Sequence, residues 1–173
     1  MTKKLILMMG ILGLLFGCKS NEKTTEAPTS HPSPLAQQKM PEGRLLRVSF
    51  FYQGMMMEEL GNFDLHREAD GKTAVLSFRH YSDEVSHEVS DTLFDAARRI
   101  IEEEKMYEYA SSYKLEMKEM ILDGYSWGFD ADFEGDEHIA SGGSNVSPRG
   151  DGLNKIRNLL YEAAKRVVEA DQK

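Results

Sequence analysis

Two apolar stripes constrain the fold of this 173-residue chain more than any other feature, because each must be buried against an apolar surface. The longer stripe follows Asp151 and recurs at helical spacing: Leu153, Ile156, Leu159, Leu160, Ala163, Ala164, Val167 and Val168. The shorter stripe comprises Leu93, Ala97, Ile100 and Ile101. It begins at Thr92-Leu93-Phe94-Asp95, a pattern typical of a capping box, and runs to about Tyr107. The sequence predicts two amphipathic helices, capped by Thr92 and Asp151.

The surface that these helices need is predicted by segments rich in β-branched and aromatic residues. Four such segments precede the first helix: Leu45–Gln53, Gly61–Arg67, Lys72–Tyr81 and Val85–Val89. Asp70-Gly71 is a tight-turn signal before the third of them. Between the helices, Tyr125–Phe133 and His138–Ser141 predict a hairpin that turns near Glu134-Gly135-Asp136.

The order of these elements predicts an α+β fold with two layers. An antiparallel sheet, made of a meander plus a hairpin, would carry both amphipathic helices on one face. Tyr113–Leu122 fits a strand or a helix equally well. We expect a single domain over residues 43–171, which is an ordinary domain size.

The first eighteen residues predict where the chain is located. Lys3 and Lys4 precede a twelve-residue run, Leu5–Phe16, that is apolar apart from two glycines, and Gly17-Cys18 follows. The run is too short to span a bilayer core, which needs about 20 apolar residues. Charge, apolar run and small residue in this order indicate a secretory signal peptide, residues 1–17. A cysteine directly after it resembles the lipobox of bacterial lipoproteins.

That resemblance implies that Cys18 is lipidated after removal of residues 1–17, with acyl chains such as palmitate that anchor the protein to a membrane. Cys18 is the only cysteine, so no disulfide or thiolate metal site is expected in the folded part. Residues 18–42 contain four of the five prolines and almost no large apolar side chain. They predict a disordered tether between the lipid and the domain. The localisation expected is the cell envelope, at the outer membrane, with its face left open.

Charge excludes one class of partner. Removal of residues 1–17 takes away Lys3 and Lys4, two of the 21 basic residues, and no acidic residue, so the mature net charge is −10. An acidic surface repels nucleic acid and anionic headgroups, so we expect no nucleic-acid partner and membrane attachment through the lipid alone.

Two short motifs in the second half carry a further resemblance. Asp123-Gly124-Tyr125-Ser126-Trp127, then a strand, then Ser141-Gly142-Gly143-Ser144-Asn145-x-x-Pro148 before the last helix resemble a pattern in small lipoproteins of the Bacteroides type. The similarity spans about residues 44–165. It implies the same element order and a lipoprotein, and it implies no catalytic residue. We also expect no cofactor.

Candidate metal ligands lie in the predicted hairpin. Asp130, Asp132, Glu134 and Asp136 alternate as in the start of a calcium loop. The twelfth position, however, is Ser141 where a calcium loop needs a bidentate Glu. The alternative is a solvent-facing strand whose intervening residues, Phe129, Ala131 and Phe133, point inward.

Candidate ligand-binding residues are Tyr125, Trp127, Ser144 and Asn145. The two aromatic rings could stack on a sugar, or they could be core and edge residues of the hairpin. The stretch Gly142-Gly143-Ser144-Asn145 could present backbone amides to an anion, or it could be a bend that glycine permits.

No catalytic constellation stands out, since the chain has no Gly-x-Ser-x-Gly elbow and no His-x-x-x-His or His-x-His pair. We therefore expect a non-enzymatic envelope module that binds a protein, a peptide or a glycan. The alternatives are an envelope hydrolase whose site lies in loops, and a calcium-binding envelope protein. Whether the chain is an enzyme stays open at this point.

Overall fold

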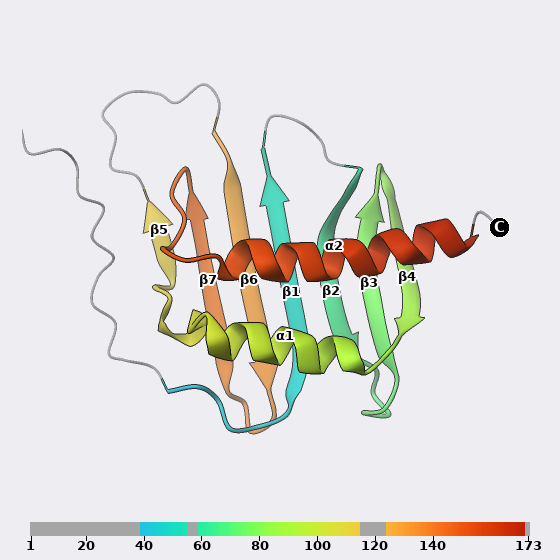
Figure 1. The fold of residues 1–173 in the computed structure, drawn as a ribbon, viewed down its shortest axis with the longest axis horizontal. Coiled ribbons are helices and arrows are strands. Elements are labelled where there is room, and N and C mark those ends of the chain that lie inside the picture. The colour runs from blue at the N-terminus through green and yellow to red at the C-terminus, as the bar shows by residue number, and fades with distance from the viewer. Residues whose placement is uncertain (1–38, 55–58, 115–123, 172–173) are drawn as a thin grey trace, which may run out of the picture.

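The computed structural model describes residues 39–54, 59–114 and 124–171. The signal peptide, Cys18, the tether up to residue 38 and residues 115–122 of the ambiguous stretch lie outside the described residues. Within the described residues the order is four strands, a helix, a short 3-10 turn, three strands and a helix (Figure 1). The strands are β1 (Leu45–Gln53), β2 (Leu60–Arg67), β3 (Ala74–His80), β4 (Asp83–Val89), β5 (Ser112–Lys114), β6 (Ser126–Phe133) and β7 (His138–Ser144). The helices are α1 (Thr92–Glu103), η1 (Met106–Glu108) and α2 (Gly152–Asp171).

The fold is α+β, with one seven-stranded sheet in the order β4-β3-β2-β1-β6-β7-β5. All neighbouring strands are antiparallel except β5, which runs parallel to β7. The predicted meander and hairpin are therefore parts of a larger sheet. They are joined because β1 pairs with β6 over its whole length, and β5 adds an edge strand that the sequence left undecided.

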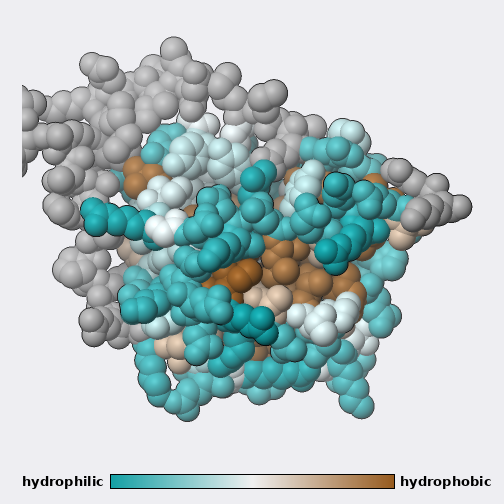
Figure 2. All heavy atoms as spheres, in the orientation of Figure 1, coloured by the Kyte–Doolittle hydropathy of each residue, from teal (hydrophilic) through white to brown (hydrophobic). Residues whose placement is uncertain are grey.

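Both helices lie on the same face of the sheet and cross its strands (Figure 1). Their apolar stripes bury Phe94, Ala97 and Ile101 from α1, and Ile156, Leu160, Ala163, Ala164 and Val167 from α2. Alternation along β6 turns Trp127, Phe129, Ala131 and Phe133 into the same core, as the strand interpretation predicts. We call the opposite side, on which no described helix lies, the open face. Figure 2 shows the helix side as mostly hydrophilic, with apolar side chains visible between the two helices.

The predicted capping box at the start of α1 is wrong. The N-cap is Asp91, and no side chain caps the helix start. Asp91 instead pairs with Arg67 and Arg44, and the Thr92 hydroxyl lies 2.9 Å from that of Ser90. These alternative partners take the oxygens that would otherwise accept from the first helical amides.

Asp151 directly precedes α2. Its carbonyl oxygen accepts from the Lys155 amide at 2.9 Å, and its carboxylate accepts from the side-chain amide of Asn154, also at 2.9 Å.

No helix in the described part of the chain has the length and apolar character needed to cross a membrane.

Candidate functional site

The two sequence motifs lie next to each other in space, where β6 begins and β7 ends. Trp127 lies directly opposite Gly143 in the β6–β7 ladder, and Tyr125 stands opposite Asn145. The Asn145 amide nitrogen donates to the Tyr125 carbonyl at 3.0 Å, while the Asn145 side-chain oxygen accepts from the Tyr125 amide at 2.9 Å. Asn145 has a φ of 59°, a left-handed conformation that asparagine adopts more readily than most residues. This reciprocal pair fixes the chain as it leaves the sheet for α2.

Trp127 lies at the centre of the region where the two motifs meet. Its side chain is buried, and the indole nitrogen donates to the Val146 carbonyl at 2.7 Å. A Cβ at Gly143 would lie 2.8 Å from both the indole nitrogen and the Val146 oxygen. Glycine at this position is what lets the indole lie against β7. The motifs are therefore explained in part by this packing.

A pocket of about 230 Å³ opens beside Trp127, between the ends of β1 and β6 and the start of α2. We call it the aromatic pocket. Phe50, Tyr52 and Trp127 supply rings, Leu153 adds an aliphatic side chain, and the polar members are Ser147, Asn154 and Arg157. Phe50 and Trp127 are buried and form its floor, whereas Ser147 and Asn154 are exposed at its rim. Aromatic rings at the floor with a few polar groups at the rim are features of small-molecule sites.

Contacts around Tyr52 hold the pocket wall in place. Its ring stacks on that of Tyr125, with centroids 5.7 Å apart and planes 23° apart. The Arg157 guanidinium lies over the Tyr52 ring, 6.0 Å from its centroid. The Tyr125 hydroxyl in turn lies 3.4 Å from that of Ser147. These contacts connect β1, the residue just before β6, the loop before α2 and α2 itself.

The four ligand-binding candidates therefore have different places. Trp127 lines the aromatic pocket. Tyr125 and Asn145 lie behind the residues that line the pocket. Ser144 is an exposed residue at the end of β7 and is paired with Ser126. Sequence reasoning missed Tyr52 and Arg157, which come from β1 and α2. The signal that could have found Tyr52 is its alternation with Val48 and Phe50 on the inward side of β1.

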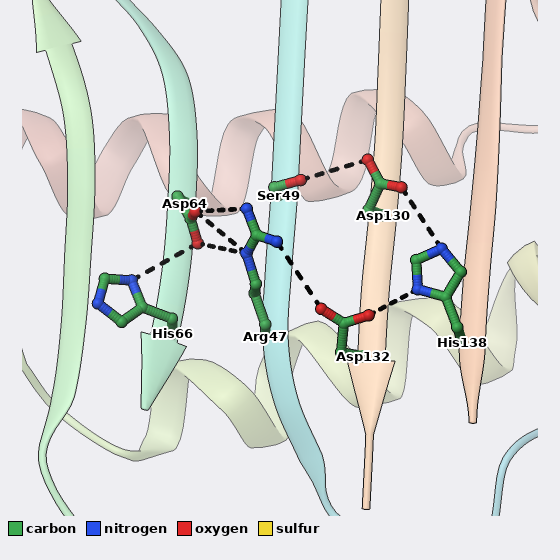
Figure 3. A network of polar contacts seen from close by, with 7 residues as sticks. All are labelled: Arg47, Ser49, Asp64, His66, Asp130, Asp132 and His138. Atoms are coloured by element: carbon green, nitrogen blue, oxygen red, sulfur yellow. Dashed lines mark hydrogen bonds and ion pairs between the residues drawn. The ribbon is translucent and has the colours of Figure 1, made fainter. Parts of the chain in front are cut away.

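The open face carries the second candidate group, a chain of polar contacts across four strands (Figure 3). Arg47 on β1 donates to both carboxylate oxygens of Asp64 on β2, at 2.7–3.1 Å, and its guanidinium lies 3.8 Å from Asp132 on β6. The hydrogen bonds to Asp64 raise the pKa of the Arg47 guanidinium above its ordinary value. His66 Nδ1 lies 3.5 Å from the Asp64 oxygen Oδ1, which also accepts from Arg47 Nε.

His138 on β7 links the two aspartates of β6. Its Nδ1 lies 2.6 Å from Asp132 and its Nε2 lies 3.6 Å from Asp130, whose other oxygen is 3.5 Å from the Ser49 hydroxyl. A Ser–His–Asp triad needs the imidazole between the serine and the carboxylate, so that it can take the hydroxyl proton. Here the Asp130 carboxylate lies between Ser49 and His138. The arrangement does not activate the serine.

The predicted metal ligands do not converge. Asp130 and Asp132 point from the open face, whereas Glu134 and Asp136 belong to the turn between β6 and β7. Glu134 accepts from the Arg44 amide at 3.4 Å. Among the residues that the structure describes, no three His, Cys, Asp or Glu side chains are grouped so that they could hold a metal ion.

No family model matches the chain, and neither a curated protein nor a solved structure is significantly similar to it. The indications of function therefore lie in the two sites themselves.

Proposed function

We propose that this chain is a lipoprotein of the bacterial cell envelope, anchored by the lipid on Cys18 at the outer membrane, whose domain binds a small ligand in the aromatic pocket. The observation that carries the binding role is the pocket itself, with a buried aromatic floor and three polar side chains at or near its rim. The anchoring role rests on the charge, apolar run and cysteine of residues 1–18.

Binding is favoured over hydrolysis by the chemistry of the polar groups. The pocket presents a hydroxyl, an amide and a guanidinium, which orient a ligand through hydrogen bonds. Among the described residues that line it there is no carboxylate or imidazole to act as a general base. His66 and His138 of the open face lie beside aspartates, and the Ser49 hydroxyl contacts a carboxylate.

Anchoring is tested by metabolic labelling with an alkyne analogue of palmitate. Cells producing the full chain should incorporate the label and retain the protein in the outer-membrane fraction, and cells producing Cys18→Ser should do neither. Label on the Cys18→Ser chain would contradict lipidation at Cys18.

Binding is tested with the mature chain carrying Cys18→Ser, which keeps it off membranes. The immobilised chain is exposed to soluble glycan and peptide fragments of the envelope, and the retained fragments are compared with those on Tyr52→Leu. Phe51→Leu is the matched control, because Phe51 is adjacent on β1 but on the open face. We expect retention by wild type and Phe51→Leu and its loss in Tyr52→Leu. Equal retention by all three chains would remove the pocket as the site.

A further inference from the structure

Strand β4 forms one edge of the sheet, and no strand among the described residues pairs with its outer side. All seven of its residues pair with β3 without a register shift, and the strand contains neither proline nor glycine. Bulges, prolines and very short strands are devices that keep an edge from pairing with another chain. β4 has none of these, although it carries charged side chains.

The turn before β4 determines which of its backbone groups point outward. A two-residue turn connects β3 to β4, so the pair that closes it, His80 and Asp83, is hydrogen-bonded. Hydrogen-bonded and non-hydrogen-bonded pairs alternate along an antiparallel ladder. The residues whose amide and carbonyl groups point away from β3 are therefore Glu84, Ser86 and Glu88.

The side chains of these three residues lie on the open face, because their partners on β3 alternate with buried core residues. Glu84 and Glu88 are exposed, and within the described part of the chain neither carboxylate has an ion pair or a hydrogen bond. Arg79 is the cross-strand partner of Glu84, but its guanidinium turns toward β2, where a Cβ at Gly61 would lie 3.1 Å from it. The edge therefore presents two carboxylates on either side of Ser86.

Helix α2 extends past this edge of the sheet (Figure 1). It begins over β6, since Leu153 and Trp127 line the same pocket, and its twenty residues make it about 30 Å long. The four strand spacings from β6 to β4 span only about 19 Å. The last part of α2 therefore lies over a position that a further strand would occupy.

The core ends at this edge in apolar side chains that are only half-buried. Val85 and Val89 of β4 and Val168 of α2 pack against the core and remain partly exposed. A strand added to β4 would place every second side chain beside these valines and beneath α2. Apolar side chains at those positions would extend the core.

A second copy of the chain fits this edge poorly. Antiparallel pairing of two β4 strands about Ser86 would place each Glu84 opposite a Glu88, and like charges directly opposite destabilise a strand pair. The two-fold axis of such a pair is perpendicular to the sheet, so both copies of α2 would lie on the same side. Each would then extend over the β4 strand that the other helix already covers. A peptide without a helix meets neither obstacle.

We propose that β4 is a docking edge for an extended peptide, which adds to the sheet as an antiparallel strand. The peptide carries basic side chains opposite Glu84 and Glu88 and apolar side chains on the side of α2. Main-chain hydrogen bonds to β4 give affinity, and the alternation of side chains gives specificity, as in other strand-addition complexes. This edge lies at the end of α2 opposite to the aromatic pocket, so the inference goes beyond the ligand binding proposed above.

The first experiment compares two heptapeptides, Val-Lys-Val-Thr-Val-Lys-Val and Val-Glu-Val-Thr-Val-Glu-Val. Each carries a fluorophore at its amino end and an amide at its carboxyl end, and binding to the mature Cys18→Ser chain is measured by fluorescence anisotropy. We expect the lysine peptide to bind at least tenfold more tightly than the glutamate peptide. Its affinity should fall as salt is raised, because screening weakens exposed charge pairs.

Methylation of the peptide backbone tests strand pairing without any change to the protein. In the antiparallel arrangement, the amides of the two lysines and the threonine face β4, whereas the amides of the valines between them face away. N-methyl groups on the lysines and the threonine should abolish binding of the lysine peptide. N-methyl groups on the valines between them should leave it.

Substitutions in β4 locate the binding. Ser86→Pro removes an outward amide that β3 does not use, so the fold should persist and peptide binding should be lost. Ser86→Ala, which keeps this amide, is the matched control and should bind as wild type does. Glu84→Lys combined with Glu88→Lys should reverse the preference in favour of the glutamate peptide. Tyr52→Leu, in the aromatic pocket, should leave peptide binding unchanged.

Four results would overturn the inference. The first is equal binding of the two peptides, and the second is an equal effect of the two methylation patterns. The third is sedimentation of the chain alone as a dimer that Ser86→Pro dissociates, because the edge would then belong to a second copy. The fourth is absence of binding at millimolar lysine peptide, which would mean that Glu84 and Glu88 only protect the edge from pairing. None of these results bears on retention of envelope fragments by the aromatic pocket.

Discussion

The two sides of the sheet share one packing arrangement, and it has opposite consequences on each side. On each side an aromatic ring lies over a glycine that is its direct cross-strand partner. Trp127 lies over Gly143 on the covered side, and Phe51 lies over Gly128 on the open face. Trp127 is 2 % exposed and donates a hydrogen bond, while Phe51 is 43 % exposed.

The comparison distinguishes two roles of glycine. Gly128 only makes room for a ring, whereas Gly143 makes room for a ring that helps to form a pocket. On the covered side, the ring is held by the strand below it, by Val146 and by the ring of Tyr113 at 5.8 Å, and so it can form the floor of a pocket. On the open face the Phe51 ring lies over Gly128 of β6 and is partly exposed, so we expect that it can move aside. The covered side should therefore be sensitive to substitution and the open face tolerant.

Truncation of the two rings should show the largest difference. We expect Trp127→Ala to lower the free energy of unfolding by about 3–5 kcal/mol, because it leaves a cavity and an unpaired Val146 carbonyl. Phe51→Ala should lower it by less than about 1 kcal/mol, because the ring is partly in water already. Urea unfolding followed by circular dichroism measures both. Equal losses would mean that the open face is covered in solution.

We expect the buried Tyr109 hydroxyl to limit stability at alkaline pH. Burial, with a smaller contribution from the charge of Glu104, raises the pKa of Tyr109 from 10 to about 12. The stability that comes from keeping this group neutral is complete below pH 10 and is lost as the pH rises to 12. Unfolding should become easier by about 2–3 kcal/mol over this window.

Chemical unfolding at pH 9, 10, 11 and 12 checks this, with two phenylalanine variants as references. Tyr109→Phe should lose less stability over the window than wild type. Tyr81→Phe, which removes an exposed hydroxyl, should follow the wild-type curve. A Tyr109→Phe curve parallel to the wild type would show that other groups cause the alkaline loss.

Sequence periodicity was sufficient for the parts of the fold that depend on near neighbours. The four-strand meander, the hairpin around Glu134-Gly135-Asp136 and both helices follow from alternation, turn residues and apolar stripes. The pairing of β1 with β6 and the parallel strand β5 were not predicted, because they depend on contacts between distant segments. The cap of α1 failed for a related reason, since Asp91 is held by Arg67 and Arg44 from elsewhere.

The same limit applies to the candidate site. Trp127 could be selected from the sequence because a single tryptophan in a hairpin is conspicuous. Tyr52 lies opposite it only because β1 pairs with β6, and Arg157 joins them only because α2 crosses that end of the sheet. Alternation correctly placed Asp130 and Asp132 on the solvent side, but it could not show that His138 links them.

Substitution of the two glycines should change the free energy of unfolding in the same order as truncation of their aromatic partners, but by a smaller amount. A Cβ at Gly143 would meet Trp127 and the Val146 backbone at 2.8 Å, so Gly143→Ala should cost about 1–3 kcal/mol. A Cβ at Gly128 would meet the Phe51 ring, which can swing into water, and Gly128→Ala should stay within about 0.5 kcal/mol of wild type. Urea midpoints decide the matter, and a Gly128→Ala loss equal to that of Gly143→Ala would contradict the mobility assigned to Phe51.

The smallest effect is expected in the polar network of the open face. Arg47→Met removes the contacts to Asp64 and Asp132, but the Arg47 side chain is 46 % exposed, and such pairs contribute about 0.2–1 kcal/mol. The loss should shrink when salt is raised from about 0.05 to about 1 M, because screening weakens exposed ion pairs. The Debye length falls from about 14 Å to about 3 Å over this range. Lys165→Met, which removes a looser pair with Glu169, is the reference for an isolated surface charge. A salt-independent loss well above 1 kcal/mol would show that the network is shielded from solvent, and the open face would then have to be treated as an interface.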